Sequence, residues 1–379
     1  MANDNLANLS ASLQTRLEKC ERNCCIMKEL FYANLLLIEN ASFLYSSPKE
    51  IEEIKLSKLE GMLLGEAIGD ILGSTLEGED PGTKASLAPI TSFHPKAHFT
   101  DDTQFTFMKL EVLLNEGWFN PEALARRYIE EWIIGIGSAT KAFIKKFKDL
   151  KYPWFLSGVE SAGNGALMSL SPIIIPHLKK PSNELWCDAV VTTRIIYWDR
   201  LAISSSVSFT NLLWKIFSMN KAPNEEWWIN EYVKVAREIE GDNSKYASRS
   251  DYLYEGPAWQ FVEEVLTKAV NGRMSTYELS ELVGSGAYLL ETIPVSLYIL
   301  MQHASDPISA LSDAVTYAED ADTVGAIVGY FVGALNGIEA FPEHLVKPLI
   351  KGKLPFTEGK LPKRYLNLIK ECKKVFKNV

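Results

Sequence analysis

The sequence predicts an all-α fold, with one large helical-bundle domain preceded by an N-terminal helical extension. Apolar residues recur at helical spacing along residues 61–77 and 319–337, and no comparable stretch alternates apolar and polar residues as a strand would. Of the 379 residues, 47% are hydrophobic and 23% are charged, which is the balance of a globular protein with a large core.

The extension, residues 1–55, differs from the domain that follows at 56–379. Residues 1–12 are small and polar, whereas residues 13–45 mix apolar and polar side chains at helical spacing and predict one or two helices. Two interpretations of these helices stay open. They pack on the main core, or they form an arm that contacts a partner.

Two series of glycines at intervals of four predict a close contact between helices that are distant in sequence. The series are Gly61, Gly65, Gly69 and Gly73, and then Gly325, Gly329, Gly333 and Gly337. Each glycine inside a helix costs about 1 kcal/mol relative to alanine. A close approach of two backbones would offset that loss, so we expect the two helices to meet in the centre of one domain.

Helical patterns continue through the rest of the chain. Further helices are expected within 121–148, 184–218, 279–301, 307–318 and 363–377. Pro294 predicts a break in the third of these. Residues 219–275 are polar and aromatic, which favours short surface helices and loops with no part in the chemistry.

The composition limits the kinds of partner and the cellular compartment that we expect for this protein. The net charge of −9 disfavours a nucleic-acid-binding surface. The cysteines lack paired spacing and are expected to be reduced thiols; they are Cys20, Cys24, Cys25, Cys187 and Cys372. We find no signal pattern and no uninterrupted membrane span, and we expect a cytoplasmic monomer.

Two acidic clusters, each at the start of a predicted helix, are the main candidates for chemistry. They are Asp320, Asp322 and Thr323, and Thr100, Asp101 and Asp102. A helix N-terminus favours ionised carboxylates and capping side chains, so capping alone would explain either cluster. Together the four carboxylates would repel one another without a cation. Two Mg²⁺ or Mn²⁺ ions about 4 Å apart would neutralise them.

A loop of small residues at 161–168 is a candidate phosphate site. It reads Ser-Ala-Gly-Asn-Gly-Ala-Leu-Met, and free N–H groups on such a loop can cradle a phosphate. Gly-Asn-Gly also occurs in ordinary turns. Glu77 follows the first glycine series, where a loop would present it to a site or leave it on the surface.

Four blocks in order resemble the ADP-ribosylglycohydrolase family, which includes the ADP-ribosylarginine hydrolases. The blocks are Gly65 to Glu77, Thr100-Asp101-Asp102-Thr103, Gly163-Asn164-Gly165 with Met168 and Pro172, and Asp320-Ala321-Asp322-Thr323. The resemblance covers residues 56–345 and implies an all-α bundle with a binuclear Mg²⁺ or Mn²⁺ centre. It also implies hydrolysis of the bond between ADP-ribose and a protein side chain, arginine above all.

The resemblance assigns roles to residues of this chain. The six residues of the acidic clusters would bind the metals, Glu77 would be an acid/base near the scissile ribose, and Asp101 and Asp102 would each act as ligand or base. The diphosphate would lie against Gly135, Ile136, Gly137, Ser138, Ser161, Gly163, Asn164, Gly165 and Met168. The family pattern has other residues at Ala321, Glu319, Ser169 and Tyr197, which bears on substrate orientation and rate.

The extension resembles those of family members that act as immunity proteins. This resemblance implies that residues 1–55 block a cognate ADP-ribosyltransferase toxin while the main domain removes the ADP-ribose that the toxin attaches. Two alternatives stay open: hydrolysis of another ADP-ribose linkage, to serine or an O-acyl group, and an inactive inhibitor that only binds the toxin.

Overall fold

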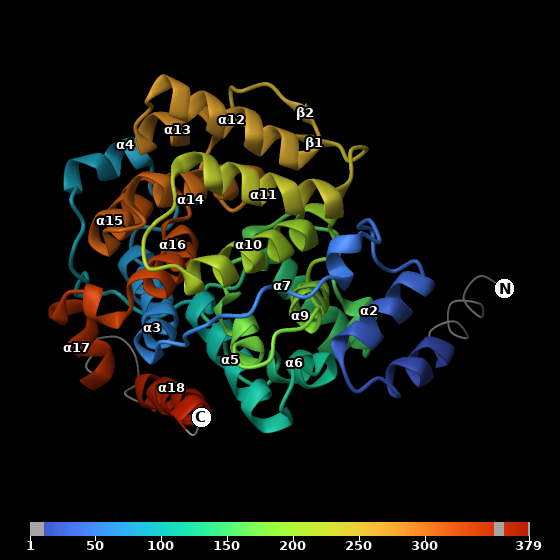
Figure 1. Cartoon of the computed structure of the whole chain (residues 1–379). Helices are drawn as coiled ribbons and strands as arrows, with labels where there is room; N and C mark the ends of the chain where they lie inside the picture. The colour runs from blue at the N-terminus through green and yellow to red at the C-terminus, as the bar shows by residue number, and fades with distance from the viewer. Residues whose placement is uncertain (1–10, 352–359, 378–379) are drawn as a thin grey trace.

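The computed structural model describes residues 11–351 and 360–377, and it confirms a helical domain with one small hairpin (Figure 1). The α-helices are α2 (Asn23–Tyr32), α3 (Leu56–Gly73), α4 (Pro81–Lys84), α5 (Asp101–Glu116), α6 (Pro121–Arg127), α7 (Ser138–Ile144), α8 (Trp154–Ser157), α9 (Glu184–Arg194), α10 (Arg200–Ser218), α11 (Glu225–Glu240), α12 (Ala258–Gly272), α13 (Thr276–Val283), α14 (Leu289–His303), α15 (Pro307–Tyr317), α16 (Ala321–Asn336), α17 (Glu343–Lys351) and α18 (Lys360–Lys377). Short 3-10 or π turns are η1 (Ser42–Tyr45), η2 (Ala85–Leu87), η3 (Lys145–Asp149), η4 (Asn164–Ala166), η5 (Ser171–His177) and η6 (Ile338–Ala340). Strands β1 (Tyr246–Ala247) and β2 (Glu255–Gly256) pair antiparallel.

Helices α3 and α16 lie side by side at the centre, as the two glycine series predict. A Cβ added at Gly69 would lie 1.9 Å from the carbonyl oxygen of Gly325, and one at Gly329 would lie 2.1 Å from that of Gly65. The backbones therefore touch, and no residue with a side chain fits at these contacts. The pair ends with Gly73 against Ala321, so the start of α16 lies beside the end of α3.

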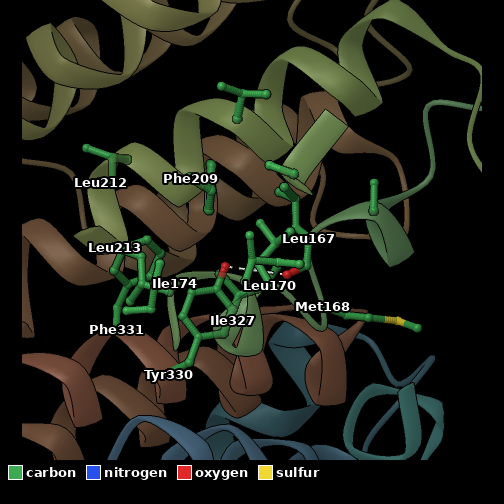
Figure 2. Close-up of a cluster of buried hydrophobic side chains, with 14 of the residues drawn as sticks. Leu167, Met168, Leu170, Ile174, Phe209, Leu212, Leu213, Ile327, Tyr330 and Phe331 are labelled. Atoms are coloured by element: carbon green, nitrogen blue, oxygen red, sulfur yellow. Dashed lines mark hydrogen bonds between the residues drawn. The ribbon is translucent and has the colours of Figure 1, made fainter. Parts of the chain in front are cut away.

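Besides its contact with α3, α16 packs on α10 and on the chain after the 161–168 loop (Figure 2). The cluster contains Leu167, Leu170, Ile174, Phe209, Leu212, Leu213, Ile327, Tyr330 and Phe331, all buried. The Tyr330 hydroxyl lies 3.4 Å from the carbonyl oxygen of Leu167, to which it donates a hydrogen bond. The core thus fixes the 161–168 loop relative to α16.

Two expectations for the second half of the chain are wrong. Residues 219–275 form the long helices α11 and α12 joined through the β1–β2 hairpin, and aromatic residues such as Trp228 and Phe261 are buried on them. The break expected at Pro294 falls instead at Gly284, whose φ of +83° follows the end of α13. Pro294 lies inside α14, where the helix continues past the lost hydrogen bond.

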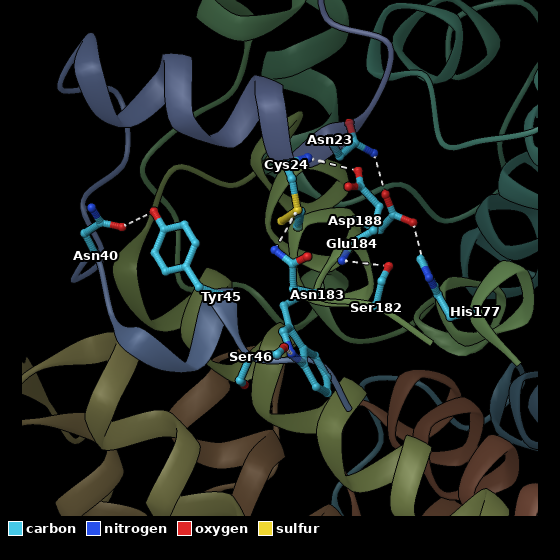
Figure 3. The surroundings of a disulfide bond; sticks show 12 residues. Asn23, Cys24, Asn40, Tyr45, Ser46, His177, Ser182, Asn183, Glu184 and Asp188 are labelled. Carbon is cyan, nitrogen blue, oxygen red and sulfur yellow. Dashed lines mark hydrogen bonds and ion pairs between the residues drawn. A yellow bond between two sulfur atoms is a disulfide. The ribbon is translucent and has the colours of Figure 1, made fainter. Parts of the chain in front are cut away.

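The expectation of reduced cysteines is also wrong. Cys24 forms a disulfide with Cys187 (Figure 3). Cys20 forms one with Cys25, and Cys372 is free and buried. The reason is tertiary: α2 packs along α9, which brings two cysteines 163 residues apart into contact. A cytoplasmic location therefore loses the support of free thiols and stays a prediction.

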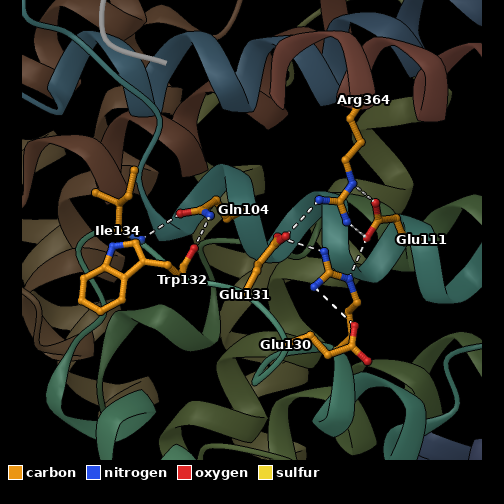
Figure 4. Close-up of polar contacts among 8 residues, drawn as sticks. Gln104, Glu111, Glu130, Glu131, Trp132, Ile134 and Arg364 are labelled. Carbon is orange, nitrogen blue, oxygen red and sulfur yellow. Dashed lines mark hydrogen bonds and ion pairs between the residues drawn. The ribbon is translucent and has the colours of Figure 1, made fainter. Parts of the chain in front are cut away.

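The described part of the extension packs on the core. Leu13, Met27, Leu30 and Leu44 are buried, and the Trp186 indole donates a hydrogen bond to the carbonyl oxygen of Ser46 at 2.8 Å. At the other end of the chain, α18 docks through Arg364, which pairs with Glu111 and Glu131 (Figure 4). Within residues 11–351 and 360–377, no helix combines the length and apolar character of a membrane span.

Candidate active site

One cavity of about 650 Å³ opens where α3, α5 and α16 meet. Its walls come from the loop after α3, the start of α5, the 135–137 loop with the start of α7, the 160–168 loop and the turn after α9. The β1–β2 hairpin and the starts of α14 and α16, with the residues just before them, complete the walls. The lining includes Glu77, Asp101, Gly135, Gly137, Ser138, Glu160, Ser161, Gly163, Asn164, Gly165, Met168, Tyr197, Arg249, Gly286, Tyr288, Glu291, Glu319, Asp320, Asp322 and Thr323. Members of both acidic clusters and of the glycine loops expected from the sequence thus line one cavity.

Asp70, near the end of α3, organises the floor of this site. Its carboxylate accepts hydrogen bonds from the Thr100 backbone N–H at 3.0 Å and hydroxyl at 2.8 Å, and from the Thr103 backbone N–H at 3.2 Å. These bonds tie the start of α5 to α3. The Thr100 hydroxyl also lies 3.0 Å from Asp102 Oδ2, so Thr100 lies between two carboxylates.

The carboxylates gather in two groups that share Asp322. Oxygen atoms of Asp70, Asp102 and Asp322 lie within 4.8 Å of one another, and so do those of Glu77, Asp320 and Asp322. The Oδ1 atom of Asp102 is buried and has no hydrogen-bond partner within residues 11–351 and 360–377. A buried carboxylate oxygen without a donor is the ligand that a hard divalent cation satisfies. The residues present therefore fit a metal centre.

Electrostatics agree with that fit. Burial, and then the neighbouring carboxylates, raise the pKa of Asp102 and of Asp322 well above the ordinary value. Lys84 lies below the cluster and is buried, and its ammonium group donates hydrogen bonds to the carbonyl oxygens of Leu76 and Ala318. Burial lowers the pKa of Lys84 to about 8. One buried ammonium group does not balance five carboxylates, so a cation would relieve the remaining repulsion.

The glycine loops are fixed from several sides. The Asn164 amide donates to Asp320 Oδ2 at 2.7 Å and lies 3.0 Å from the Thr292 hydroxyl, which joins the 161–168 loop to the acidic cluster. Gln104 on α5 accepts from the Ile134 backbone N–H at 2.8 Å and donates to the Trp132 carbonyl at 3.1 Å (Figure 4). This contact holds the chain just before Gly135, whose φ of +84° suits glycine.

The site residues predicted from the sequence lie at different depths relative to the cavity. Glu77 is exposed at the cavity, Asp101, Asp320, Asp322 and Thr323 line it, and Thr100 and Asp102 lie buried beneath. Of the glycine-loop residues, Ile136 alone packs against the hydrophobic core instead of lining the cavity. Tyr197, one of the positions at which the sequence departs from the family pattern, lies against Gly165, where an added Cβ would be 2.1 Å from the Tyr197 hydroxyl.

Sequence reasoning missed several residues of the cavity. Arg249 lies over the Tyr288 ring at 4.1 Å, and both line the wall formed by the β1–β2 hairpin and the start of α14. Arg249 belongs to the segment that was expected to carry no chemistry, and no motif marks it. Asp70 could have been found, because its carboxylate lies in the first glycine series, one position after Gly69.

The site therefore belongs to the class of acidic centres that a helical bundle builds at one cavity and that fit divalent cations. The model of the ADP-ribosylglycohydrolase family matches residues 52–374, so the chain belongs to this family. The family supports ADP-ribosyl hydrolase activity and is metal-dependent, which agrees with the acidic groups.

Individual relatives are distant. The chain is similar to the uncharacterized protein YegU of Escherichia coli (23% identity; 79% of this chain, 92% of YegU) and to the ADP-ribosylhydrolase ARH3 of Xenopus tropicalis (23%; 76% and 89%). It is also similar to the ADP-ribosylarginine hydrolase Tri1 of Pseudomonas putida (23%; 78% and 75%). A solved structure described as an ADP-ribosylglycohydrolase-related protein complex matches with a TM-score of 0.60 at 23% identity, covering 83% of this chain and 98% of that one.

Proposed function

We propose that this protein hydrolyses the bond between ADP-ribose and a protein arginine side chain, with two divalent cations, Mg²⁺ or Mn²⁺, at the carboxylate groups. The observation that carries the proposal is the pair of carboxylate groups that share Asp322 at one end of a cavity lined by glycine loops. The residues that would hold the cations are Asp70, Glu77, Thr100, Asp101, Asp102, Asp320, Asp322 and Thr323.

The cations, when bound, would orient the ribose hydroxyls and activate a water molecule. Residues of this chain would transfer the protons and bind the diphosphate. Glu77 and Asp101 face the cavity and can exchange a proton with the water or the departing side chain. The water oxygen forms the new bond to the ribose carbon C1″, the bond from C1″ to the side-chain nitrogen breaks, and the nitrogen receives the proton. Ser138, Ser161 and the N–H groups of the 163–165 loop would hold the diphosphate.

Arginine as the acceptor is supported by carboxylates beyond those of the two groups. Glu160, Glu291 and Glu319 also line the cavity. Glu319 follows the end of α15 beside the loop of Glu77, since its carbonyl oxygen accepts a hydrogen bond from the Gly78 N–H at 2.8 Å. A guanidinium group is cationic, so carboxylates near the reacting end favour it over a neutral serine oxygen.

The test is release of ADP-ribose from a protein modified on arginine, with Mg²⁺ and with EDTA. We expect release by the wild type, loss with EDTA, and a decrease of at least about a hundredfold in Asp322→Ala. Asp242→Ala is the matched control, because Asp242 is exposed and, in the part of the chain that the structure describes, its carboxylate forms an ion pair with Arg237 alone. Wild-type release that persists in EDTA and in Asp322→Ala would refute the metal-dependent function.

A second experiment distinguishes hydrolysis of the arginine linkage from hydrolysis of the serine linkage. Glu319→Gln removes one carboxylate from the wall without changing its size. We expect its kcat/KM for the arginine substrate to fall about tenfold while that for a serine-linked substrate changes little. If the wild type hydrolyses only the serine or O-acyl linkage, the alternative hydrolase is correct.

Binding of a toxin through residues 1–55 stays a prediction. The described residues 11–55 are docked, so a toxin would meet their outer face, where Tyr32 is 78% exposed. Equal affinity of the wild type and Tyr32→Ala for an ADP-ribosyltransferase, measured by calorimetry, would speak against this surface.

A further inference from the structure

Arg194, the last residue of α9, lies between the N-terminal extension and the cavity. Its side chain is 1% exposed, and its Nε donates a hydrogen bond to the carbonyl oxygen of Leu35 at 2.9 Å. Its guanidinium lies over the Trp198 ring at 3.9 Å. Burial lowers the pKa of Arg194 to about 9, with no carboxylate contributing to that shift. A buried cation without a charged partner is unfavourable, so its retention calls for a reason.

The extension presents the Leu35 carbonyl in a fixed place. Asn34, at the end of α2, has a φ of +54°, and the Leu35 N–H donates to the carbonyl oxygen of Leu30 at 2.9 Å. Helix α2 is itself tied to α9: the Asn23 amide donates to Asp188 at 2.7 Å, and Cys24 is bonded to Cys187 (Figure 3). The Leu35 carbonyl that contacts Arg194 is therefore held in a fixed position by the packing of α2 on α9.

On its other side, Trp198 supports the loop that forms one wall of the cavity. A Cβ at Gly158 would lie 2.1 Å from the Trp198 indole nitrogen, so the ring packs directly on this backbone. The backbone N–H of Trp198 donates to the carbonyl oxygen of Val159 at 2.7 Å, and the backbone N–H of Val159 donates to that of Ile196 at 2.9 Å. Glu160, Ser161 and the 163–165 loop follow at once and line the cavity.

We propose that Arg194 is a positioning residue: held by the Leu35 carbonyl, it fixes Trp198 and thereby the 158–165 loop that receives the diphosphate of the substrate. The extension is then part of the binding site's support. The role of the loop in substrate binding rests on the proposed function, whereas the mechanical link does not. Asn164 is also held from α14, through the Ala287 carbonyl and Thr292, so the acidic cluster keeps its partner when Arg194 is lost.

The experiment compares the wild type with Arg194→Met, Arg194→Lys and the control Arg200→Met. Arg200 also contacts the extension, through Glu39 at 3.2 Å, and it donates to the Glu240 carbonyl. For Arg194→Met we expect KM to rise about tenfold with kcat within about twofold, because the loop contacts a part of the substrate that does not react. Amide hydrogen exchange at residues 158–165 should accelerate, and Arg200→Met should match the wild type in both readouts.

Unchanged KM and unchanged exchange in a folded Arg194→Met would overturn the proposal. If that variant does not fold, Arg194→Lys decides by the same criteria, since it keeps the charge and loses the planar guanidinium. A wild type that releases no ADP-ribose would refute the proposed function, and exchange at 158–165 would still decide whether Arg194 holds the loop.

Discussion

The α3–α16 contact and the α2–α9 contact both join segments far apart in sequence, but they do so by different means. Between α3 and α16 the backbones touch, and a Cβ at any glycine of the two series except Gly337, which follows the end of α16, would overlap a carbonyl group. Between α2 and α9 the contact uses particular side chains: a disulfide, a buried amide on Asp188, and the Cys24 N–H donating to Glu184 at 2.9 Å. The first contact sets the relative positions of Asp70 and Asp322, and the second, by the proposal for Arg194, supports a wall of the cavity.

The difference teaches how each contact responds to change. A backbone contact has no side chain to adjust, so one added methyl group must move a helix. A contact made by several side chains can lose one member and keep the others. A single substitution at the α3–α16 contact should therefore lower the stability strongly, whereas a single substitution at the α2–α9 contact should lower it less.

The largest effect is expected at the centre. Gly69→Ala places a methyl group 1.9 Å from the Gly325 carbonyl oxygen, and we expect the free energy of unfolding to fall by about 4 kcal/mol. ADP-ribose release should fall as well, because Asp70 follows directly. Urea unfolding measures the first quantity. Gly272→Ala in α12 is the control, since its Cβ would meet nothing closer than 3.7 Å. Equal loss in both variants would contradict the close contact.

A smaller loss is expected at the extension. Replacing Cys24 and Cys187 by serine opens a link between residues 163 apart, which should cost about 3 kcal/mol in unfolding free energy. The matched double variant of Cys20 and Cys25 opens a link of only 5 residues and should cost less. Thermal unfolding with and without a reductant gives both comparisons. A wild type that is insensitive to the reductant would show that these links do not stabilise it.

The smallest effect is a dependence on pH at the same contact. Burial raises the pKa of Glu184, so between its ordinary value and the raised one the folded protein binds more protons than the unfolded chain. The free energy of unfolding should therefore fall as the pH rises through this window and level off above it. Glu184→Gln should remove the part of this decline that Glu184 contributes and keep the Cys24 contact. The part due to other buried carboxyl groups, such as Asp102 and Asp322, should stay. Glu226→Gln, on the exposed first turn of α11, should leave the decline in place.

The sequence by itself determined the periodic features of this protein. Helical spacing gave the all-α fold, the glycine intervals gave the α3–α16 contact, and the motifs brought Asp101, Asp320 and Asp322 to one site, because each of these signals is local. Tertiary structure decided the pairing of Cys24 with Cys187, the docking of α2, the place of Arg249 in the cavity and the contact of Arg194 with Leu35. These depend on single side chains of distant segments, and no periodic pattern in the sequence marks those residues.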